Sequence, residues 1–532
     1  MEYGYYLRRA ARQFGSRIAV RSHDGAEQLT YAQLDDRADA VARFLIAQGI
    51  EKGDRVATIH ANSPRVLELD FGIARSGGVR VPVNARASAD EVAHLVNHSG
   101  AKAVIFDDPF DQLAAQLRAR VEAKPLFIGR GDHVDVDYET AFSDEGERAH
   151  ITLPRVDESD LLSIKYTGGS TGKPKGTLRT HRAQEAIALN ILLDLYPFAA
   201  DDILLQVQPL SHGAGAFILP AVMRGATQVT MRTFDAAQAA RLIEDSAVTV
   251  VKLVPTMLYR ILDQLDGPLP ASADLRAVIF GASPISEAGI RRAHELLGPR
   301  VVQTYGQTEA PVTITCFGAA DYFHSRERGD ERGRSVGRPY STVDVEIRGE
   351  DGSALPANEV GRVFVRGPML MSGYWSSDAT AVDDDGWLDT GDIGRFDGDG
   401  YLYLVDRAND MIISGGFNVY PRELEVALEE HAEVGQAIVI GLPHPDWGET
   451  VAAVVVPKSA DSIDVDDLDA HVRQTIASYK APKTYIVTSH IPVSPVGKVT
   501  RRLVKTALAD ELGLLAVGGG KHVHWERQVS DE

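Results

Sequence analysis

One short segment of this chain brings together glycines, hydroxyl groups and lysines. It reads YTGGSTGKPKG and runs from Tyr166 to Gly176. Its glycines let the backbone turn several N–H groups toward one anion, while the hydroxyls and lysines add further donors and positive charge. We therefore predict a phosphate-binding loop, which we call the glycine loop, with candidate contacts at Thr167, Ser170, Thr171 and Lys175.

The glycine loop does not follow the Walker A pattern. That pattern places four residues between its first glycine and a Gly-Lys pair, and it then requires serine or threonine for the metal. Here three residues separate Gly168 from Gly172, and Pro174 follows Lys173. A metal ligand must therefore come from another part of the chain.

The same segment also contains Gly-x-Ser-x-Gly, the pattern of the nucleophile elbow in α/β-hydrolases, with Ser170 as the nucleophile. The segment HGAG, which starts at His212, is a weak match to their oxyanion loop. In those enzymes the oxyanion loop precedes the serine, whereas here it follows by about forty residues. Phosphate binding is therefore favoured, and a serine hydrolase and a plain solvated loop are the alternatives.

Other segments supply the further groups that a nucleotide site needs. In YGQTE, Tyr305 offers an aromatic face for a purine, the Thr308 hydroxyl suits a phosphate, and Glu309 offers a carboxylate for Mg²⁺. In DTGDIGRF, Asp392 has two acceptor oxygens for a ribose diol. Arg407 has a forked donor for the same sugar or for a phosphate.

Lys498 lies on a Pro/Gly turn, PVGKVTR, where a small mobile domain could carry it to a reacting phosphate. Taken singly, each of these residues has a structural explanation as a core aromatic, a helix charge, a turn residue or a solvated lysine. Their joint presence favours a site that adenylates its substrate.

The elements around these segments follow an α/β pattern. Capping boxes at Thr30–Gln33 and Ser88–Glu91 predict helix starts, and Ser63-Pro64 predicts a third. Strands are predicted at 55–60, 79–83 and 103–107 between these helices. Such alternation predicts parallel strands covered by helices.

The pattern of predicted helices and strands changes twice in the second half of the sequence. From about residue 333 short β segments punctuated by glycine predict a β-rich closing subdomain, and the DGDG at 397–400 predicts a hairpin turn rather than a calcium loop. A fresh α+β pattern follows 408, and the end of the chain resembles a frayed tail. We therefore predict an α/β fold with a large N-terminal domain of helix-covered sheets (1–408, β-rich at about 333–408) and a small mobile C-terminal domain (409–532).

Composition limits the possible functions. The 532 residues carry a formal net charge of −20, which argues against binding to nucleic acid or to an anionic membrane. The single cysteine, Cys316, excludes an internal disulfide and is expected to be a small buried hydrophobe. No apolar run approaches the ~20 residues that span a bilayer. We therefore expect a cytoplasmic protein without a membrane span.

The motifs together resemble the adenylate-forming superfamily of acyl-CoA synthetases, peptide-synthetase adenylation domains and luciferases. The glycine loop, YGQTE, the DTGD and VDR pair, ISGGFNVYPRELE at 413–425, and PVGK follow the order and spacing of that family. The likeness covers roughly 30–512. It implies that a carboxylate reacts with ATP to give acyl-AMP and pyrophosphate, after which the small domain rotates and a thiol takes the acyl group.

The resemblance also implies roles for individual residues. For the phosphates and the metal, it implies that the β- and γ-phosphates are bound by Thr167, Ser170, Thr171 and Lys175, the α-phosphate by Thr308, and Mg²⁺ by Glu309. For the nucleoside, it implies that adenine is bound by Tyr305, Ala282 and Ser283, and ribose by Asp392 and Arg407. It also implies that Lys498 catalyses adenylation and that the pantetheine tunnel of coenzyme A is flanked by Gly415 and Gly416. Two positions depart from the family pattern. Gly168 replaces a common serine, and Asn409 stands at the hinge where aspartate or lysine is more usual.

The choice of acid should depend on a small and mostly apolar set of residues. By resemblance, His212, Phe217, Gly281 and Thr304 line the acyl pocket, and His212 stands beside the carboxylate, although a structural histidine is equally consistent. No aspartate lies within 209–217, which disfavours an α-amino acid. We expect an ATP-dependent ligase that joins an apolar, aryl or fatty acid to coenzyme A.

Three alternatives remain beside that ligase. They are an acyl-AMP ligase that serves a carrier protein, a serine hydrolase, and a degenerate nucleotide sensor, which the presence of both Glu309 and Lys498 disfavours. The sequence leaves open whether the protein is a homodimer.

Overall fold

The computed structural model describes residues 1–106, 110–143, 148–167, 174–270, 272–283, 285, 287–322, 331–377, 381–407, 410–414, 417–444, 448–458, 463–477, 480–493, 499–508 and 522–525. Its contacts define two compact units. The first contains Met1–Val345 and Val365–Leu388, and the second contains Glu346–Phe364 and Asp389–Glu532. The division into domains 1–408 and 409–532 stays a prediction. Among the described residues, no helix is long and apolar enough to cross a membrane.

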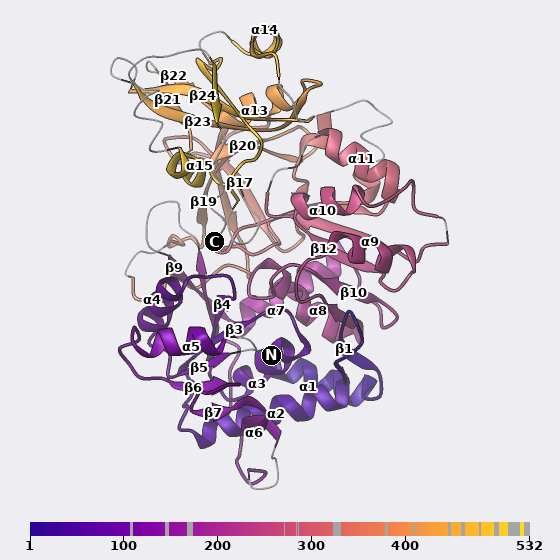
Figure 1. The fold of residues 1–532 in the computed structure, drawn as a ribbon, viewed down its shortest axis with the longest axis vertical. Helices are drawn as coiled ribbons and strands as arrows, with labels where there is room; N and C mark the ends of the chain where they lie inside the picture. Colours follow the sequence, from indigo (N-terminus) through magenta and orange to yellow (C-terminus); the bar gives the residue numbers. More distant parts are fainter. Residues whose placement is uncertain are drawn as a thin grey trace. The chain divides into compact units, whose positions relative to one another are not determined.

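A seven-stranded sheet in the first unit contains the two strands that flank the glycine loop in the sequence (Figure 1). Its strand order is β7-β6-β5-β3-β4-β8-β9. All neighbouring strands are parallel except β8 and β9, which form an antiparallel pair. The strands are β3 (Arg55–His60), β4 (Val79–Asn84), β5 (Ala103–Phe106), β6 (Leu126–Gly129), β7 (Val136–Asp137), β8 (Leu161–Thr167) and β9 (Lys175–Thr180). Helices α2 (Tyr31–Ala47), α3 (Pro64–Arg75), α4 (Ala89–Ser99), α5 (Asp111–Arg118) and α6 (Tyr138–Ser143) alternate with these strands along the chain.

The local helix signals explain where these helices begin. The Thr30 hydroxyl accepts from the Gln33 backbone N–H at 3.2 Å, and the Gln33 side chain accepts from the Thr30 N–H at 2.9 Å. The same reciprocal pair joins Ser88 and Glu91. Both predicted capping boxes are therefore confirmed. Helix α3 begins after Ser63 as predicted, but the Ser63 side chain makes no capping bond, so the proline at its first position marks this start.

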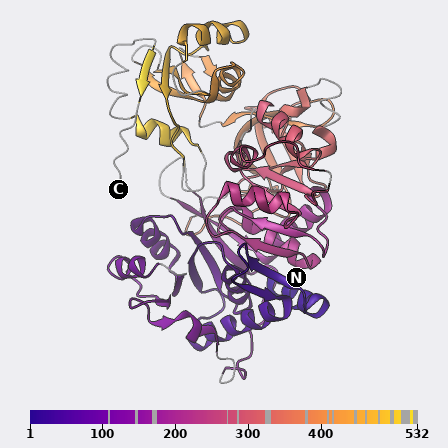
Figure 2. The same cartoon turned by 45° about the vertical axis from the view of Figure 1, so that its right-hand side comes forward.

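A nine-stranded sheet forms the other layer of the first unit (Figure 2). Its order is β16-β15-β14-β13-β12-β10-β11-β1-β2. The strands are β1 (Ile18–Ser22), β2 (Gln28–Thr30), β10 (Ile203–Gln206), β11 (Thr227–Thr230), β12 (Val250–Leu253), β13 (Ala277–Gly281), β14 (Val301–Tyr305), β15 (Thr315–Phe317) and β16 (Arg338–Pro339). The helical segments of this part are α1 (Tyr3–Phe14), α7 (His181–Asn190), η1 (Ile191–Leu195), η2 (Gly213–Phe217), α8 (Ile218–Arg224), α9 (Ala236–Glu244), α10 (Pro255–Leu262), α11 (Glu287–Leu297) and η3 (Glu331–Arg334).

The second unit contains most of a four-stranded sheet and all of a six-stranded sheet. The four-stranded sheet has the order β17 (Asp344–Arg348), β18 (Gly361–Arg366), β19 (Leu388–Phe396), β20 (Leu402–Arg407). The remaining elements are β21 (Ile412–Ser414), β22 (Phe417–Val419), α13 (Pro421–Glu429), β23 (Val434–His444), β24 (Gly448–Pro457), α14 (Val465–Thr475), β25 (Thr484–Thr488), α15 (Arg501–Ala507) and β26 (His522–Trp525).

Two expectations about this second unit have clear outcomes. The turn between β19 and β20 is a hairpin in which the Asp397 N–H donates to the Tyr401 carbonyl at 3.0 Å, as predicted. The expected frayed tail is wrong in part, because β26 pairs in parallel with β25. Four apolar or aromatic residues suffice to extend an existing sheet edge, which composition alone does not reveal.

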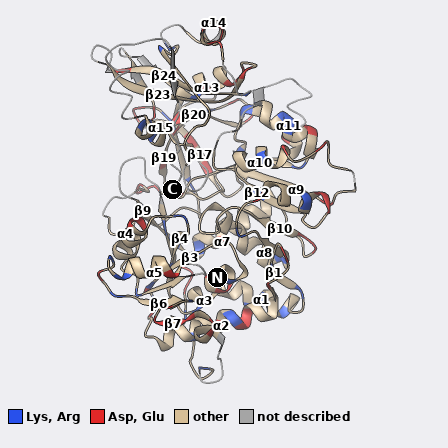
Figure 3. Ribbon diagram, in the orientation of Figure 1, with Lys and Arg blue, Asp and Glu red and all other residues tan. Residues whose placement is uncertain are grey.

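Charged residues of both signs are interspersed along the helices of the first unit (Figure 3). This distribution is that of an ordinary solvated surface.

Candidate active site

Strands β8 and β9 flank the glycine loop in the sequence. Thr167 and Lys175 are directly opposite each other in this antiparallel pair. The Lys175 side chain is exposed. Ser170 and Thr171 lie outside the described residues, as does Gly168, so their contacts with phosphates stay predictions.

A segment far along the chain, 371–375, lies beside β9. The Trp375 N–H donates to the Gly176 carbonyl at 2.7 Å, and the Met371 N–H donates to the Glu309 carbonyl at 2.9 Å. The 371–375 segment therefore connects the hairpin of the glycine loop with the residue predicted to meet Mg²⁺.

Tyr374 joins two of the predicted site residues through its side chain. Its hydroxyl donates to Glu309 Oε1 at 3.0 Å, and the Lys175 Nζ lies 5.2 Å from the centre of its ring. Burial, together with the negative charge of Glu309, raises the pKa of Tyr374, so the phenol keeps the proton that it donates. Sequence reasoning missed Tyr374, because its relation to Glu309 depends on pairing between distant segments.

The backbone of Thr308 is bound by a buried arginine, Arg179. Arg179 is 3% exposed, and its Nη2 donates to the Thr308 carbonyl at 3.1 Å. Burial and the nearby charge of Arg80 lower the pKa of Arg179 to about 10, while Glu309 opposes this shift. Arg179 therefore stays charged at neutral pH. It places positive charge near Thr308 and Glu309, the residues predicted to contact the α-phosphate and Mg²⁺.

His212 lies in the loop before η2, where the side chain of the buried Lys165 approaches it. Its Nδ1 lies 2.8 Å from the Ser211 hydroxyl, and the Lys165 Nζ donates to the His212 carbonyl at 3.5 Å. Burial, reinforced by Arg179 and Arg80, holds the pKa of Lys165 well below its usual value. The neighbourhood of His212 is therefore polar.

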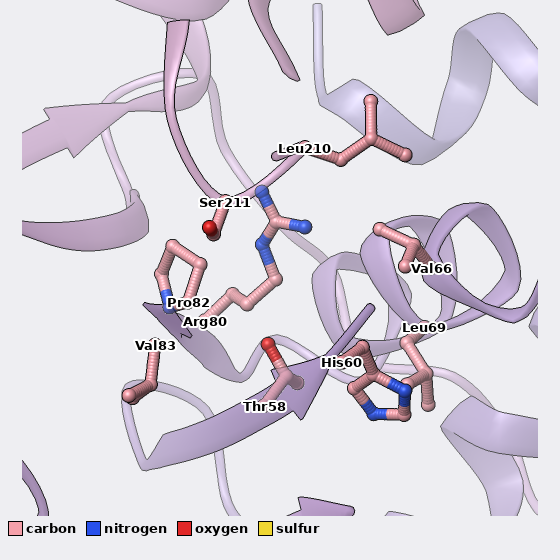
Figure 4. Close-up of a pocket in the computed structure, with 9 residues that line it drawn as sticks. All are labelled: Thr58, His60, Val66, Leu69, Arg80, Pro82, Val83, Leu210 and Ser211. Atoms are coloured by element: carbon pink, nitrogen blue, oxygen red, sulfur yellow. The ribbon is translucent and has the colours of Figure 1, made fainter. Parts of the chain in front are cut away.

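A small cavity of about 10 Å³, enough for about one water, adjoins this loop (Figure 4). In the close-up the guanidinium of Arg80 extends toward Ser211, and Thr58 and His60 come from the neighbouring strand. The cavity is too small for an organic acid, so it does not serve as the acyl pocket.

The predicted acyl-pocket residues lie on neighbouring elements. Gly281 and Thr304 are paired across β13 and β14, and a Cβ on Gly281 would stand 2.3 Å from the Thr304 carbonyl oxygen. The Thr304 hydroxyl donates to the Val312 carbonyl and lies 3.1 Å from the Tyr340 hydroxyl. Phe217, the last residue of η2, is fully buried in the apolar core.

The predicted adenine contacts follow the same two strands. Ala282 comes directly after β13 and has a φ of 75°, a left-handed conformation that is unusual for alanine, and Ser283 follows it. Tyr305 ends β14. Because β13 and β14 are parallel, these residues leave the sheet at the same edge, where ligands of α/β sheets commonly bind.

The predicted ribose residues are neighbours in the second unit. Asp392 and Arg407 are directly opposite each other in the β19–β20 ladder, and the Asp392 N–H donates to the Thr390 hydroxyl at 3.1 Å. The side chain of Arg407 lies outside the described part of the chain. The strand register therefore agrees with the prediction that both residues bind the ribose, which stays a prediction.

A partly buried ion-pair cluster surrounds the start of α15. Arg501 binds Glu425 at 2.7 Å and Asp410 at 3.0 Å, and it donates to the Val439 carbonyl at 2.9 Å. It follows the predicted adenylation lysine by three residues. Lys498, the predicted hinge Asn409, and the predicted coenzyme A contacts Gly415 and Gly416 lie outside the described residues.

The described residues contain no group of three or more His, Cys, Asp or Glu side chains that could hold a metal by themselves. Mg²⁺ is commonly bound through one or two carboxylates together with substrate phosphates. Glu309, which shares the contact residue Tyr374 with Lys175, fits that mode. The Cys316 thiol is partly buried and packs against the apolar core, and burial raises its pKa to about 12, so it stays protonated at neutral pH.

Comparison with known proteins identifies the family. A model of the AMP-binding enzyme family matches residues 7–375, and a model of the AMP-binding enzyme C-terminal domain matches residues 423–498. The chain is 34% identical to a medium/long-chain-fatty-acid–CoA ligase, FadD8 of Mycobacterium tuberculosis, over 92% of this chain and 87% of the relative. It is 36% identical to a feruloyl-CoA synthase of an Amycolatopsis species, over 93% and 97% of the two chains.

A solved structure gives the same result for the fold. The ATP-bound MatB of Rhodopseudomonas palustris matches with a TM-score of 0.85 and 28% identity, over 96% of this chain and all of that one. The fold class and the enzyme class predicted from the motifs are thereby confirmed. The chain belongs to the AMP-binding enzyme family, whose members here include acyl-CoA ligases.

Proposed function

We propose that this protein is an ATP-dependent ligase that activates an apolar, aryl or fatty carboxylic acid as acyl-AMP and passes the acyl group to coenzyme A. Family membership supports the reaction class. The observation that carries the proposal is the convergence of Lys175, from the glycine loop, and Glu309 on one side chain, Tyr374. A phosphate-binding lysine and a carboxylate suited to Mg²⁺ therefore lie together.

In the first step a carboxylate oxygen of the acid attacks the α-phosphorus of ATP. The bond between the α-phosphorus and the bridging oxygen breaks, and pyrophosphate leaves. Both reactants are anions, so the site must neutralise charge and hold them in line. The proposal gives these tasks to the N–H groups of the glycine loop, to Lys175 and to Lys498, with Thr308 at the α-phosphate.

Glu309 would hold Mg²⁺ together with the ATP phosphates, and the bound ion would add positive charge where pyrophosphate leaves. The buried Arg179 supports this arrangement, because it fixes the backbone of Thr308 next to Glu309. Adenine would lie against Tyr305 and the backbone of Ala282 and Ser283, and the ribose would be bound by Asp392 and Arg407.

In the second step the coenzyme A thiolate attacks the acyl carbon, and AMP leaves with the oxygen that came from the acid. No nucleophilic side chain is required, which agrees with a chain whose single cysteine has a raised pKa. Gly415 and Gly416 would flank the pantetheine tunnel. Asn409 would be the hinge about which the small domain rotates between the two steps.

The acyl pocket would be lined by His212, Phe217, Gly281 and Thr304. The hydroxyl of Thr304 is engaged with Val312 and Tyr340, and Phe217 belongs to the apolar core, so both favour an uncharged acyl group. We further propose a cytoplasmic location, since ATP, coenzyme A and a chain without disulfides suit a reducing compartment.

A pyrophosphate-release screen over aliphatic, aryl and amino acids tests this proposal. The reactions should be run with ATP and Mg²⁺, with and without coenzyme A, and the products identified by mass spectrometry. We expect pyrophosphate with aliphatic or aryl acids and the matching acyl-CoA when coenzyme A is present. Activity confined to amino acids would contradict the proposed substrate class.

The same screen separates the alternatives. Acyl transfer to a phosphopantetheinylated carrier protein but not to coenzyme A would indicate the carrier-protein ligase. Ester hydrolysis without ATP, together with labelling of Ser170 by a fluorophosphonate, would indicate the serine hydrolase. Binding of ATP without any release of pyrophosphate would indicate a nucleotide sensor.

A further inference from the structure

Tyr374 has a fixed place beside the proposed ATP site. Its backbone lies within the 371–375 segment, which is bound to β9 on both sides of it. The Ser372 N–H donates to the Leu178 carbonyl at 3.0 Å, and the Leu178 N–H donates to the Gly373 carbonyl at 2.9 Å. On the other side, the backbone N–H of Trp375 donates to the Gly176 carbonyl of β9 at 2.7 Å, and its indole N–H donates to the His98 carbonyl at 3.0 Å. The position of the Tyr374 side chain is therefore set by main-chain pairing.

The two ends of the Tyr374 side chain meet different groups of the proposed site. The hydroxyl donates to Glu309 Oε1, and the Lys175 Nζ lies over the ring, 5.2 Å from its centre. A carboxylate has two oxygens, so one remains for a metal when the other is held by a donor. Hydrogen bonds of this kind orient metal-binding side chains and commonly change metal affinity by about 10–100-fold when removed.

We infer that Tyr374 is a positioning residue for Mg²⁺–ATP, which orients the Glu309 carboxylate through its hydroxyl and the Lys175 ammonium through its ring. This inference rests on the proposed function, since it concerns the same ATP site. It assigns a role to a residue outside the glycine loop and outside YGQTE. The two contacts are separable, because phenylalanine keeps the ring and loses only the hydroxyl.

Equilibrium binding of ATP, measured by calorimetry in Mg²⁺ and in EDTA without an acid substrate, tests this inference apart from turnover. For Tyr374→Phe we expect the Mg²⁺-dependent gain in ATP affinity to fall by about 10-fold. Affinity in EDTA should stay near that of the wild type, because the ring still faces Lys175. Tyr374→Leu should weaken ATP binding in both conditions.

Tyr196→Phe is the matched control. The Tyr196 hydroxyl donates to Asp202 Oδ1 at 2.9 Å, so this change removes the same kind of bond elsewhere in the first unit. We expect it to leave the Mg²⁺ dependence of ATP binding unchanged. A general loss of stability would instead affect both tyrosine variants, which thermal unfolding would show.

A double-mutant cycle with Glu309→Gln completes the test. If Tyr374 acts through Glu309, the hydroxyl deletion should add no further loss of Mg²⁺ dependence in the Glu309→Gln background. Wild-type Mg²⁺ dependence in Tyr374→Phe, or additive losses in the double variant, would overturn the inference. A wild-type protein that shows no Mg²⁺-dependent ATP binding would instead contradict the proposed function, so the two failures are distinguishable.

Discussion

Asp392 and Arg407 face each other across the β19–β20 ladder, although the DTGD and VDR segments that contain them are separated by a hairpin. Asp392 is 5% exposed, so its carboxylate is largely desolvated before any ligand arrives. Hydrogen bonds to a charged group contribute about 1.5–3 kcal/mol each, and Asp392→Asn removes the charge that would bind the ribose. We therefore expect the KM for ATP to rise by about 10-fold, measured by pyrophosphate release.

Asp351→Asn is the control for this change, because Asp351 is an exposed turn residue that accepts from Ser353 in the same unit. It should leave the KM for ATP unchanged. An unaltered KM in Asp392→Asn would argue against the ribose assignment.

Lys498→Ala should separate the two half-reactions. Loss of one charge that acts in the transition state commonly lowers the rate by about 10²–10³-fold, so acyl-AMP formation should fall by that amount. Thioester formation from supplied acyl-AMP and coenzyme A should be largely kept. The two rates are measured separately, by pyrophosphate release and by acyl-CoA production.

Lys458→Ala controls for the loss of a lysine in the same unit, since Lys458 Nζ donates to the Ala432 carbonyl. It should affect neither half-reaction. Equal losses of both half-reactions in Lys498→Ala would contradict the assignment of Lys498 to adenylation alone.

His181 should make the fold sensitive to acid. It is 1% exposed, and its Nδ1 accepts the Tyr3 N–H at 2.9 Å, so burial lowers its pKa from 6.5 to about 4. Below pH 6.5 the unfolded chain binds more protons than the folded one, so stability falls as the pH drops from 6.5 toward 4. At pH 5.5 this loss is about 1 kcal/mol.

His181→Asn keeps an acceptor near Tyr3 and removes the titration. Urea unfolding at pH 7.5 and 5.5 should therefore show a pH-dependent loss of unfolding free energy that is smaller in the variant by about 1 kcal/mol. The same loss in both proteins would show that His181 does not control the response.

Gly281→Ala should destabilise the edge where the predicted acyl and adenine residues leave the sheet. Its Cβ would lie 2.3 Å from the Thr304 carbonyl oxygen, which is backbone and cannot rotate away. Overpacking of this kind costs about 1–3 kcal/mol of unfolding free energy, which urea titration measures. Gly267→Ala, where a Cβ meets nothing within 4 Å, should be neutral, and equal stabilities of the two variants would refute this explanation.

The sequence predicted best what depends on local interactions. The Thr30–Gln33 capping box forms with both of its hydrogen bonds, and β3 has the predicted bounds 55–60. The motifs also identified the family, because their order and spacing follow the chain. The hairpin turn at 397–400 was predicted from a local pattern as well, and this short hairpin places Asp392 opposite Arg407.

What the sequence did not predict depends on segments that meet only in the fold. Tyr374 reaches Glu309 because 371–375 pairs with β9, and no local pattern marks that pairing. The burial of Arg179 and Lys165 was likewise missed, since alternation along a hairpin strand does not tell which face another layer covers. The β26 strand was read as tail for the same reason.

Transfer of an oxygen isotope tests the central claim most directly. An acid that supports pyrophosphate release is labelled with ¹⁸O in both carboxylate oxygens and converted with ATP and coenzyme A, and the nucleotide product is analysed by mass spectrometry. If the carboxylate attacks the α-phosphorus, one ¹⁸O must appear in AMP for each acyl-CoA formed. Unlabelled AMP, or ADP with the label in inorganic phosphate, would contradict an acyl-AMP intermediate.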